Sequence, residues 1–456
     1  MKFSITFALS FALLLSAGIT EANVSLVNVT PSNPIDWMVP GGYTIGYIGD
    51  TGNGVLTVDN GSDIYSLIGY LGYGAGMTGS ASISGAGSTW DSQTLHIGWL
   101  GSGDLLVNGG GSVTSENIYI GGHGANTSGI LTVSGAGSTL TNNGYLGVGM
   151  NATGTLNILD GGVVNAYEAR AASSDVADTD GIMHFENGTL NTHRLYAGAS
   201  QLTGYGTINT NGLIADGIDL IFDADHGLQQ TFNLNNQGQN IVLNLDYDNT
   251  FPTNLGAGFN GNGTLTIADG VVIDSFYGQI AAWSGSVGKA TIMGQGSTWN
   301  VKTGLDVGDY GTGELEIKDG GLLCMQSTNA GMVRIDKDKD ADSFINMSTG
   351  GMFALHRDAD DSLDGFLDLL SSFGTEGIRW WDDSIADWAP ITTATRGIDY
   401  MLEYQTEGDL AGYTVLTVGI VPVWDTTVPE PGTLVLICSA LFGLGLMTAT
   451  RKRTRN

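Results

Sequence analysis

Two neighbouring segments, LTVSGAGSTL at residues 131–140 and LNILDGGVV at residues 156–164, decide the fold of this chain. Each begins with an apolar-x-apolar triplet and continues into a glycine-containing turn that leads to another large apolar residue. Alternating apolar residues are typical of a strand with one buried face, and glycine, asparagine and aspartate tolerate the positive φ of a sharp turn. The two segments therefore indicate a strand and a turn that repeat along the chain.

The triplet recurs along most of the sequence at nearly constant spacing. Its last apolar residues are Val58, Ile83, Val107, Val133, Ile158 and Phe185 in a first block, and Ile267, Ile292, Ile317 and Met347 in a second block. Successive intervals are 25, 24, 26, 25 and 27 residues in the first block, and 25, 25 and 30 residues in the second. Ile208 and Leu234 would keep the two blocks in phase, with steps of 23, 26 and 33 residues.

The repeat predicts a stacked architecture, because a unit of about 25 residues cannot bury its own apolar face whereas stacked units share one core. We expect an all-β fold, a parallel β-helix or β-solenoid of roughly 25-residue coils, over residues 23–352. Around twelve coils spaced ~4.8 Å apart would make a rod on the order of 55–60 Å long. The alternative is a flat sandwich of hairpins, with longer strands joined by two-residue turns.

Composition and charge exclude several classes of protein. The 456 residues include 46 acidic and only 16 basic side chains, for a net charge of −30, so the basic stripe of a nucleic-acid binder is missing. Two cysteines, Cys324 and Cys438, exclude a disulfide scaffold. The hydrophobic fraction of 42% argues against disorder, and the 71 glycines keep no three-residue period, which excludes collagen.

Both ends of the chain carry export-type segments. Residues 1–22 are predicted to be a signal peptide, with Lys2 before an apolar run from Phe3 to Ala17 and a cleavage site after Ala22. At the other end, residues 425–456 contain Val428-Pro429-Glu430-Pro431, then the uncharged stretch 432–450, which is long enough for a transmembrane helix. Basic residues then close the chain and predict a cytoplasmic end. They are Arg451, Lys452, Arg453 and Arg455.

This order of motif, spanning helix and basic cluster resembles the PEP-CTERM sorting signal of Gram-negative-type bacteria. The resemblance implies recognition by an exosortase-type enzyme of the inner membrane and cleavage near residues 429–431. Proteins with this signal are typically made alongside exopolysaccharide and end on the cell surface or in the matrix. The alternatives from the residues alone are a retained N-terminal anchor and a plain single-pass C-terminal anchor.

The repeats themselves resemble the T5SS/PEP-CTERM-associated repeat of autotransporter passenger regions. The likeness rests on units that alternate Gly-Ala-Gly-Ser-Thr-Trp/Leu with Asp-Gly-Gly-x-Val/Leu, roughly over residues 45–350. It implies a right-handed β-helix-like passenger at the cell surface.

Residues 353–424 break the repeat and are predicted to be a small mixed cap that covers the last coil. A short helix is expected from Ser362 to Phe373, followed by strands at 400–404 and 413–421. Three tryptophans, Trp380, Trp381 and Trp388, lie between them and are interpreted as core of the cap. The alternative is that they stack on sugar rings.

Two further groups of residues are candidate sites. The run Asp336-Lys337-Asp338-Lys339-Asp340-Ala341-Asp342 starts like a calcium loop but lacks the glycine and the final carboxylate of one, so we interpret it as a solvated insertion. No cation lies between Phe3 and Ala169 to assist a lyase. We interpret Asp160, Asp269 and Asp319 as turn residues, since they share one repeat position. The six histidines, at 96, 123, 184, 193, 226 and 356, have no ligand-like spacing.

The sequence therefore predicts no catalytic residue, no metal and no cofactor. The predicted function is that of a non-enzymatic, exported structural or adhesive rod. Its expected partners are an exosortase and exopolysaccharide or other matrix components. The alternative is a β-helix polysaccharide-processing enzyme or a glycan-binding module. Without Lys2, Glu21, Glu430 and the four basic residues of the tail, the chain keeps 11 basic and 44 acidic residues, which would favour association with an anionic matrix through divalent cations.

Overall fold

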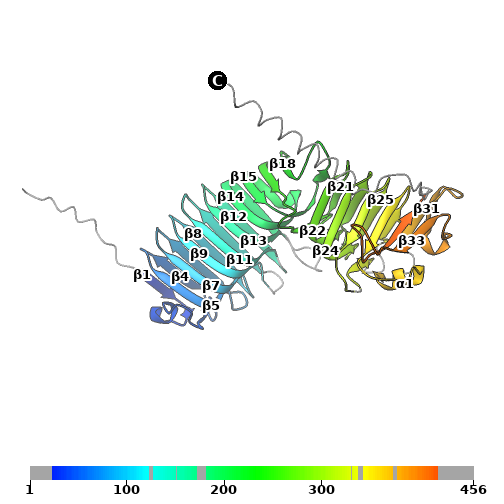
Figure 1. The fold of residues 1–456 in the computed structure, drawn as a ribbon. Coiled ribbons are helices and arrows are strands. Elements are labelled where there is room, and N and C mark those ends of the chain that lie inside the picture. The colour runs from blue at the N-terminus through cyan, green and yellow to red at the C-terminus, as the bar shows by residue number, and fades with distance from the viewer. Residues whose placement is uncertain are drawn as a thin grey trace, which may run out of the picture.

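The computed structural model describes residues 23–122, 127–149, 151–171, 181–329, 331–336, 342–372 and 377–419. Over these residues the chain is all-β and winds into a β-solenoid of about 11 turns (Figure 1). This confirms the predicted all-β solenoid. The predicted signal peptide at 1–22 and the predicted sorting segment at 425–456 lie outside the described residues. None of the helices found within the described ranges has the length and apolar character needed to cross a bilayer.

The apolar triplets lie directly above one another, as the repeat predicts. Leu56 pairs in parallel with Ala81, and the same column continues through Leu105, Leu131, Leu156 and Met183. In the second block the column contains Leu265, Ala290, Leu315 and Ile345. All of these side chains are buried. The repeat interval is therefore the length of one coil, and the parallel register excludes the hairpin sandwich.

Each coil has three walls. A short strand forms the first wall, and after a turn a longer strand forms the second and third walls. The buried positions of β5 (Asp63–Leu71) are Ile64 and Ser66, then Gly69 and Leu71, so the inward phase slips by one residue after Ser66. This slip marks a bend in the middle of the long strand, and it recurs in the strands stacked on β5.

The strands of the first wall are β4 Gly54–Asp59, β6 Thr78–Ser84, β8 Ser102–Asn108, β10 Ser128–Ser134, β12 Thr153–Leu159, the first part of β14 Gly181–Gly198, β17 Asp219–Phe222, β21 Asn262–Ile267, β23 Val287–Met293, β25 Thr312–Lys318, β28 Phe344–Met347 and β31 Ile378–Asp382. The second and third walls contain β3 Ile45–Ile48, β5, β7 Thr89–Ile97, β9 Ser112–Ile120, β11 Thr139–Val148, β13 Val163–Ala171, the rest of β14, β15 Leu202–Thr210, β16 Leu213–Asp216, β19 Gln239–Asp246, β20 Asn254–Ala257, β22 Val272–Ile280, β24 Thr298–Val307, β26 Leu322–Met325, β27 Val333–Ile335, β29 Gly351–Leu355 and β30 Ser371–Ser372. The first three residues of β15 belong to the first wall, where they pair with β14.

Glycine has two separate roles in this fold, of which the sequence indicated only one. In the turns, residues such as Gly135 and Gly137 adopt a positive φ, as expected. A second set lies inside the first-wall strands. A Cβ on Gly129 would come within 2.2 Å of the carbonyl oxygen of Ile97 and 2.4 Å of the amide nitrogen of Gly121. These strand glycines let the turn after the third wall approach the backbone of the next coil.

The repeat is interrupted between the two blocks. Ile208 of β15 pairs with Leu190, whereas the repeat predicted that it would stack above Phe185. The coil from Leu190 to Ile208 therefore has only 18 residues. Leu234 belongs to β18 (Gln229–Leu234), which forms an antiparallel hairpin with β19. The predicted phase through Ile208 and Leu234 was therefore wrong. Figure 1 shows the two parts of the rod meeting at this region.

Antiparallel strands cover both ends of the solenoid. At the N-terminal end β1 (Asn23–Val27) pairs with β4, and β2 (Val29–Thr30) pairs with β3. At the other end β34 (Thr414–Val418) pairs with β29 and with β33 (Tyr400–Tyr404). The remaining short elements are η1 Pro34–Trp37, η2 Ala199–Gln201, α1 Leu363–Asp368, β32 Asp387–Pro390 and η3 Ile391–Thr393.

The C-terminal cap agrees in outline with its prediction. The Oγ of Ser362 accepts a hydrogen bond from the amide of Gly365 at 3.0 Å and so caps α1, which ends at Asp368, earlier than expected. Strand β33 has the predicted bounds, and β34 is shorter than predicted. The proposed boundary after residue 352 lies inside β29, because the solenoid continues into the region assigned to the cap.

Candidate functional site

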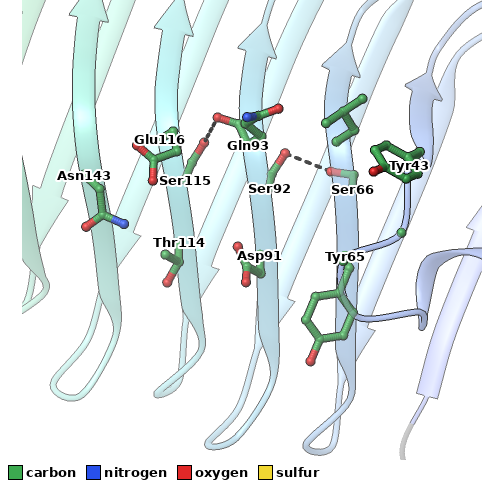
Figure 2. A pocket seen from close by; sticks show the side chains of 13 residues that line it. Tyr43, Tyr65, Ser66, Asp91, Ser92, Gln93, Thr114, Ser115, Glu116 and Asn143 are labelled. Atoms are coloured by element: carbon green, nitrogen blue, oxygen red, sulfur yellow. Dashed lines mark hydrogen bonds between the residues drawn. The ribbon is translucent and has the colours of Figure 1, made fainter.

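Two cavities follow one another along the outer surface of the second wall, at its bend toward the third wall. The first has a volume of about 280 Å³ and extends from Tyr43 to Asn143 (Figure 2). The second has a volume of about 570 Å³ and extends from Thr141 to Asp246. Asn143 lines both cavities. We call them the acidic section and the amide section of one groove that runs along the rod.

The floor of the groove is a column of outward side chains, one from each coil. Parallel register stacks them in the order Tyr65, Asp91, Thr114, Thr141, Asn165, Asn191 and Asn209, with Asn244 on the next strand. Their neighbours in the sequence point into the core, so alternation along each strand places these side chains outside. Adjacent strands hold them ~4.8 Å apart.

The acidic section contains two exposed carboxylates. Figure 2 shows Asp91 on β7 and Glu116 on β9, with Tyr65 and Tyr43 toward the N-terminal end. Tyr43 is 85% exposed. Because no lysine or arginine occurs from residue 3 to residue 169, no cation of the neighbouring coils offsets these charges. This section therefore repels anionic groups and favours cationic or neutral ones.

Buried hydroxyl groups fix the bend beneath the acidic section. Ser66 donates to the Oγ of Ser92 at 2.8 Å, and Ser92 donates to the carbonyl of Thr94 at 3.0 Å. Ser115 makes the corresponding bond to the carbonyl of Asn117 at 3.0 Å. Ser92 and Ser115 thus supply hydrogen bonds to backbone carbonyls at the bend, where the regular pattern of a strand is disturbed. These bonds stabilise the backbone at the bend beneath the groove.

The amide section has a floor of hydrogen-bonded asparagines. Asn191 donates to the Oδ1 of Asn165 at 2.9 Å, Asn209 donates to Asn191 at 2.8 Å, and Asn244 donates to Asn209 at 2.9 Å. Each amide carries two N–H donors and an oxygen with two lone pairs. One donor and one lone pair of an internal member are used within the ladder, which leaves the other donor and lone pair for a ligand or water.

The wall of the amide section contains an aromatic pair. The rings of Tyr167 and His193 stack with their centroids 5.2 Å apart, and Tyr167 is 44% exposed. Nδ1 of His193 lies 3.4 Å from the Oδ1 of Asn211. Burial lowers the pKa of His193, and the nearby charge of Arg194 acts in the same direction. At neutral pH the imidazole is therefore uncharged, and the wall is neutral along this stretch.

Outside the groove, the third wall carries a separate row of stacked rings. Tyr47 and Tyr70 lie 5.6 Å apart and nearly parallel, Tyr70 and His96 lie 4.9 Å apart, and His96 and Tyr119 lie 5.0 Å apart. Because the rings stack on one another at the spacing of the coils, the ring faces within the row contact a neighbouring ring and not a ligand. We interpret this row as stabilising the stack of coils.

The second block contains a buried carboxylate beside a cation. Asp306 is 1% exposed, and Arg334 donates to both of its oxygens while the hydroxyl of Tyr277 donates to Oδ2. Burial raises the pKa of Asp306, although both partners act to lower it. Because the three groups satisfy one another and the carboxylate is inaccessible, this cluster has the properties of a structural ion pair.

The sequence-predicted residues are found as follows. Asp160, Asp269 and Asp319 have φ values of 54°, 54° and 53°, which confirms that they are turn residues. Of the Asp336–Asp342 run, residues 337–341 lie outside the described residues, as does His123. Where the structure describes the chain, no group of three histidine, cysteine, aspartate or glutamate side chains is placed to hold a metal ion.

The tryptophans of the cap do not form one cluster. Trp380 packs against the main core and its Nε1 lies 3.3 Å from the Oγ1 of Thr393, which agrees with the predicted core role. Trp381 is 38% exposed and meets Trp388 edge to face at 5.4 Å on the β31–β32 hairpin. The cap-core interpretation was therefore wrong for Trp381, which follows Trp380, the last residue of β31 that pairs with β28.

The groove was not predicted from the sequence. The sequence feature that marks it is an asparagine directly after the first apolar residue that follows a turn, as in Val164-Asn165, Leu190-Asn191 and Ile208-Asn209.

The predicted sorting residues 428–431 and the basic residues 451–455 lie outside the described residues. In comparisons with known proteins, the chain matches no family model, no curated protein and no solved structure.

Proposed function

We propose that this protein is an exported, surface-displayed rod that acts as a structural or adhesive component of the cell surface or matrix. The observation that supports this proposal most directly is the capped solenoid, with a groove that runs along its side rather than a single deep pocket. A rod of stacked coils separates its two ends and offers a repeated surface along its length. Antiparallel strands at both ends protect it from uncontrolled end-to-end pairing.

The route of export in this proposal rests on the sequence. Residues 1–22 would direct the chain across the inner membrane, and the segment from Val428 to Pro431, with the apolar stretch and basic end that follow, would present it to an exosortase-type enzyme. Cleavage would release the rod to the surface of a Gram-negative-type bacterium, where exopolysaccharide or another matrix component is its proposed partner.

The test is to fractionate cells that contain the exosortase and to map the C-terminus of the mature protein by mass spectrometry. We expect a surface or matrix product that ends near Pro429–Pro431, and we expect a chain without residues 428–456 to lose that location. An intact C-terminus on a surface protein would show a plain anchor instead of sorting. Retention of the full chain in the cytoplasm would overturn export altogether.

A polysaccharide-processing enzyme remains the second candidate, because Asp91 and Glu116 line one cavity. Glycosidases use two carboxyl groups on either side of the scissile bond. The acidic section has the carboxylates for such a reaction, and Tyr43 and Tyr65 provide ring surface beside them. Turnover of a polysaccharide that is lost in both Asp91→Asn and Glu116→Gln would establish this function and overturn the non-enzymatic one.

A glycan-binding role of the cap is favoured by one observation, the exposed Trp381 beside Trp388. An exposed indole face can stack on a sugar ring. Quenching of tryptophan fluorescence by matrix sugars, abolished in Trp381→Ala, would support this role. Equal quenching in the variant would assign the signal to another tryptophan.

A further inference from the structure

We infer that the amide section of the groove binds a neutral, extended polysaccharide that lies along the axis of the rod. The inference rests on the proposed adhesive function and names the ligand class of the groove. Four features carry it: the shape of the groove, the spacing of its polar groups, its lack of cationic side chains and the aromatic pair in its wall.

The shape favours a chain rather than a compact ligand. The amide section is about 570 Å³ in volume and is lined by residues from several successive strands, from Thr141 on β11 to Asp246 on β19. The acidic section continues it toward the N-terminal end through Asn143. A groove that is long in one direction and open along its length accommodates a polymer, whose middle can bind without access for an end.

The polar groups repeat along the direction of the groove. Asn165, Asn191 and Asn209 present side-chain amides at steps of ~4.8 Å, about the length of one sugar residue in an extended chain. Each internal amide keeps one free donor and one free lone pair, the pair of groups that matches a sugar hydroxyl, which both donates and accepts. The ladder holds these amides in place before a ligand arrives, so binding loses little side-chain entropy.

The charge of the groove selects against acidic sugars. None of the side chains that line the amide section is a lysine or an arginine, His193 is uncharged at neutral pH, and Asp246 lies at one end. In the adjoining section, Asp91 and Glu116 would repel a uronate. Arg194 does not line the cavity; its guanidinium lies 5.1 Å from the centroid of the Tyr167 ring, donates to the Tyr167 hydroxyl and is paired with the carboxylate of Glu168. A neutral chain is therefore preferred over an anionic one.

The aromatic pair provides the apolar contact of the site. Tyr167 is 44% exposed and is fixed by its stack on His193 and by the bond from Arg194 to its hydroxyl at 3.2 Å. His193 stacks on the ring and the Arg194 guanidinium lies 5.1 Å from its centroid, and the part of the ring that they leave exposed can pack against the C–H face of a sugar while the amides bond the hydroxyl groups. Loss of this ring should therefore weaken binding and leave the fold intact.

The test is calorimetric titration of the full-length protein with neutral hexasaccharides, namely cellohexaose, maltohexaose and mannohexaose, and with hexaguluronate in the presence and absence of Ca²⁺. We expect at least one neutral hexamer to bind with no need for Ca²⁺. Tyr167→Ala and Asn191→Ala should each weaken that binding by about tenfold or more.

Two matched controls separate binding from stability. Tyr205→Ala removes a tyrosine that is 50% exposed and does not line either cavity, and Asn157→Ala removes an outward asparagine of β12 that bonds to Thr132 on the preceding coil and does not line either cavity. Both controls should bind like the wild type. A circular dichroism spectrum and melting temperature for each variant show that the solenoid is intact.

The inference is overturned if no neutral hexamer binds, or if hexaguluronate with Ca²⁺ binds more tightly than every neutral hexamer. It is also overturned if the Tyr167 and Asn191 variants bind as well as their controls. These results are independent of the proposed function, because a protein that reaches the cell surface and is processed there can still fail every titration. A cytoplasmic protein that binds cellohexaose would overturn export and leave the groove inference in place.

Discussion

The indole nitrogen of Trp90 donates a hydrogen bond to the Oγ of Ser66, one coil earlier, at a distance of 3.0 Å. Both side chains are buried inside the solenoid, and Trp299 repeats the contact with Ser275 at 2.9 Å in the second block. The largest side chain of a coil is thus attached to the bend of its neighbour. This contact joins the core to the groove, because Ser66 also lines the acidic section.

Ser66→Ala should lower the free energy of unfolding by about 1–3 kcal/mol, because the buried indole N–H of Trp90 then has no acceptor. Urea denaturation followed by circular dichroism measures the change. Ser80→Ala, on the outer surface of β6, is the control and should change stability by about 0.5 kcal/mol or less. Equal effects of the two substitutions would contradict the assigned role of the Trp90–Ser66 bond.

Gly129→Ala should destabilise the protein by about 1–3 kcal/mol, the range found for overpacked cores. The added methyl group would meet the carbonyl of Ile97 at 2.2 Å, and the backbone of an adjacent coil cannot move without disturbing its ladder. Gly52→Ala is the matched control, since its Cβ would have no atom closer than 3.6 Å. Thermal melts of the two variants should differ clearly, and a Gly129 variant as stable as the control would show that the coils can separate locally.

Asp160 tests whether the repeated aspartates are turn residues. Its φ of 54° is costly for a β-branched side chain, so Asp160→Val should destabilise by roughly 1–2 kcal/mol. Asp160→Gly should be within about 0.5 kcal/mol of the wild type, because glycine adopts this φ freely. If both variants lost the same stability, the carboxylate itself would be required, and the turn interpretation would fail.

The sequence predicted the first wall of the solenoid well, for a physical reason. Leu131 and Leu156 are separated by one interval and pair directly, because in a solenoid the repeat length sets the register. Between the blocks this rule fails, since the coil from Leu190 to Ile208 is short and a hairpin with Leu234 follows. A single sequence does not distinguish a coil with fewer residues from a coil of ordinary length whose apolar residues are displaced along the chain.

The groove was harder to predict than the core. Asn165 and Asn191 form a ladder only because they face outward in register, and a pattern of buried apolar residues does not show how outward columns align. Asp306 and Arg334 likewise lie 28 residues apart and meet because adjacent third-wall strands pair. Such contacts depend on the register of whole coils, which local sequence patterns leave open.

Arg334→Met should destabilise the second block by about 3–5 kcal/mol, because the buried carboxylate of Asp306 loses its counter-charge. Asp306→Asn in the same chain should restore part of this loss by removing the unpaired charge. A double-mutant cycle in urea measures the coupling between the two side chains. A coupling energy near zero would show that water or another group replaces the pair.

The stability of the groove wall should depend on pH through His193. Burial and Arg194 lower the pKa of His193 in the folded protein, so below the ordinary histidine pKa of about 6.5 the unfolded chain binds more protons than the folded one. Folding stability is therefore lost as the pH falls from about 6.5 toward the lower pKa of the folded state, and this group causes no loss above about pH 6.5.

His193→Gln removes the titrating group and should reduce the fall in melting temperature between about pH 7.5 and 5. A pH titration of the six histidines followed by proton NMR gives the pKa of His193 in the folded protein directly, and the spectrum of the His193→Gln variant identifies the His193 signal. A folded pKa at or above the ordinary value would contradict the prediction and would put a positive charge in the amide section near neutral pH.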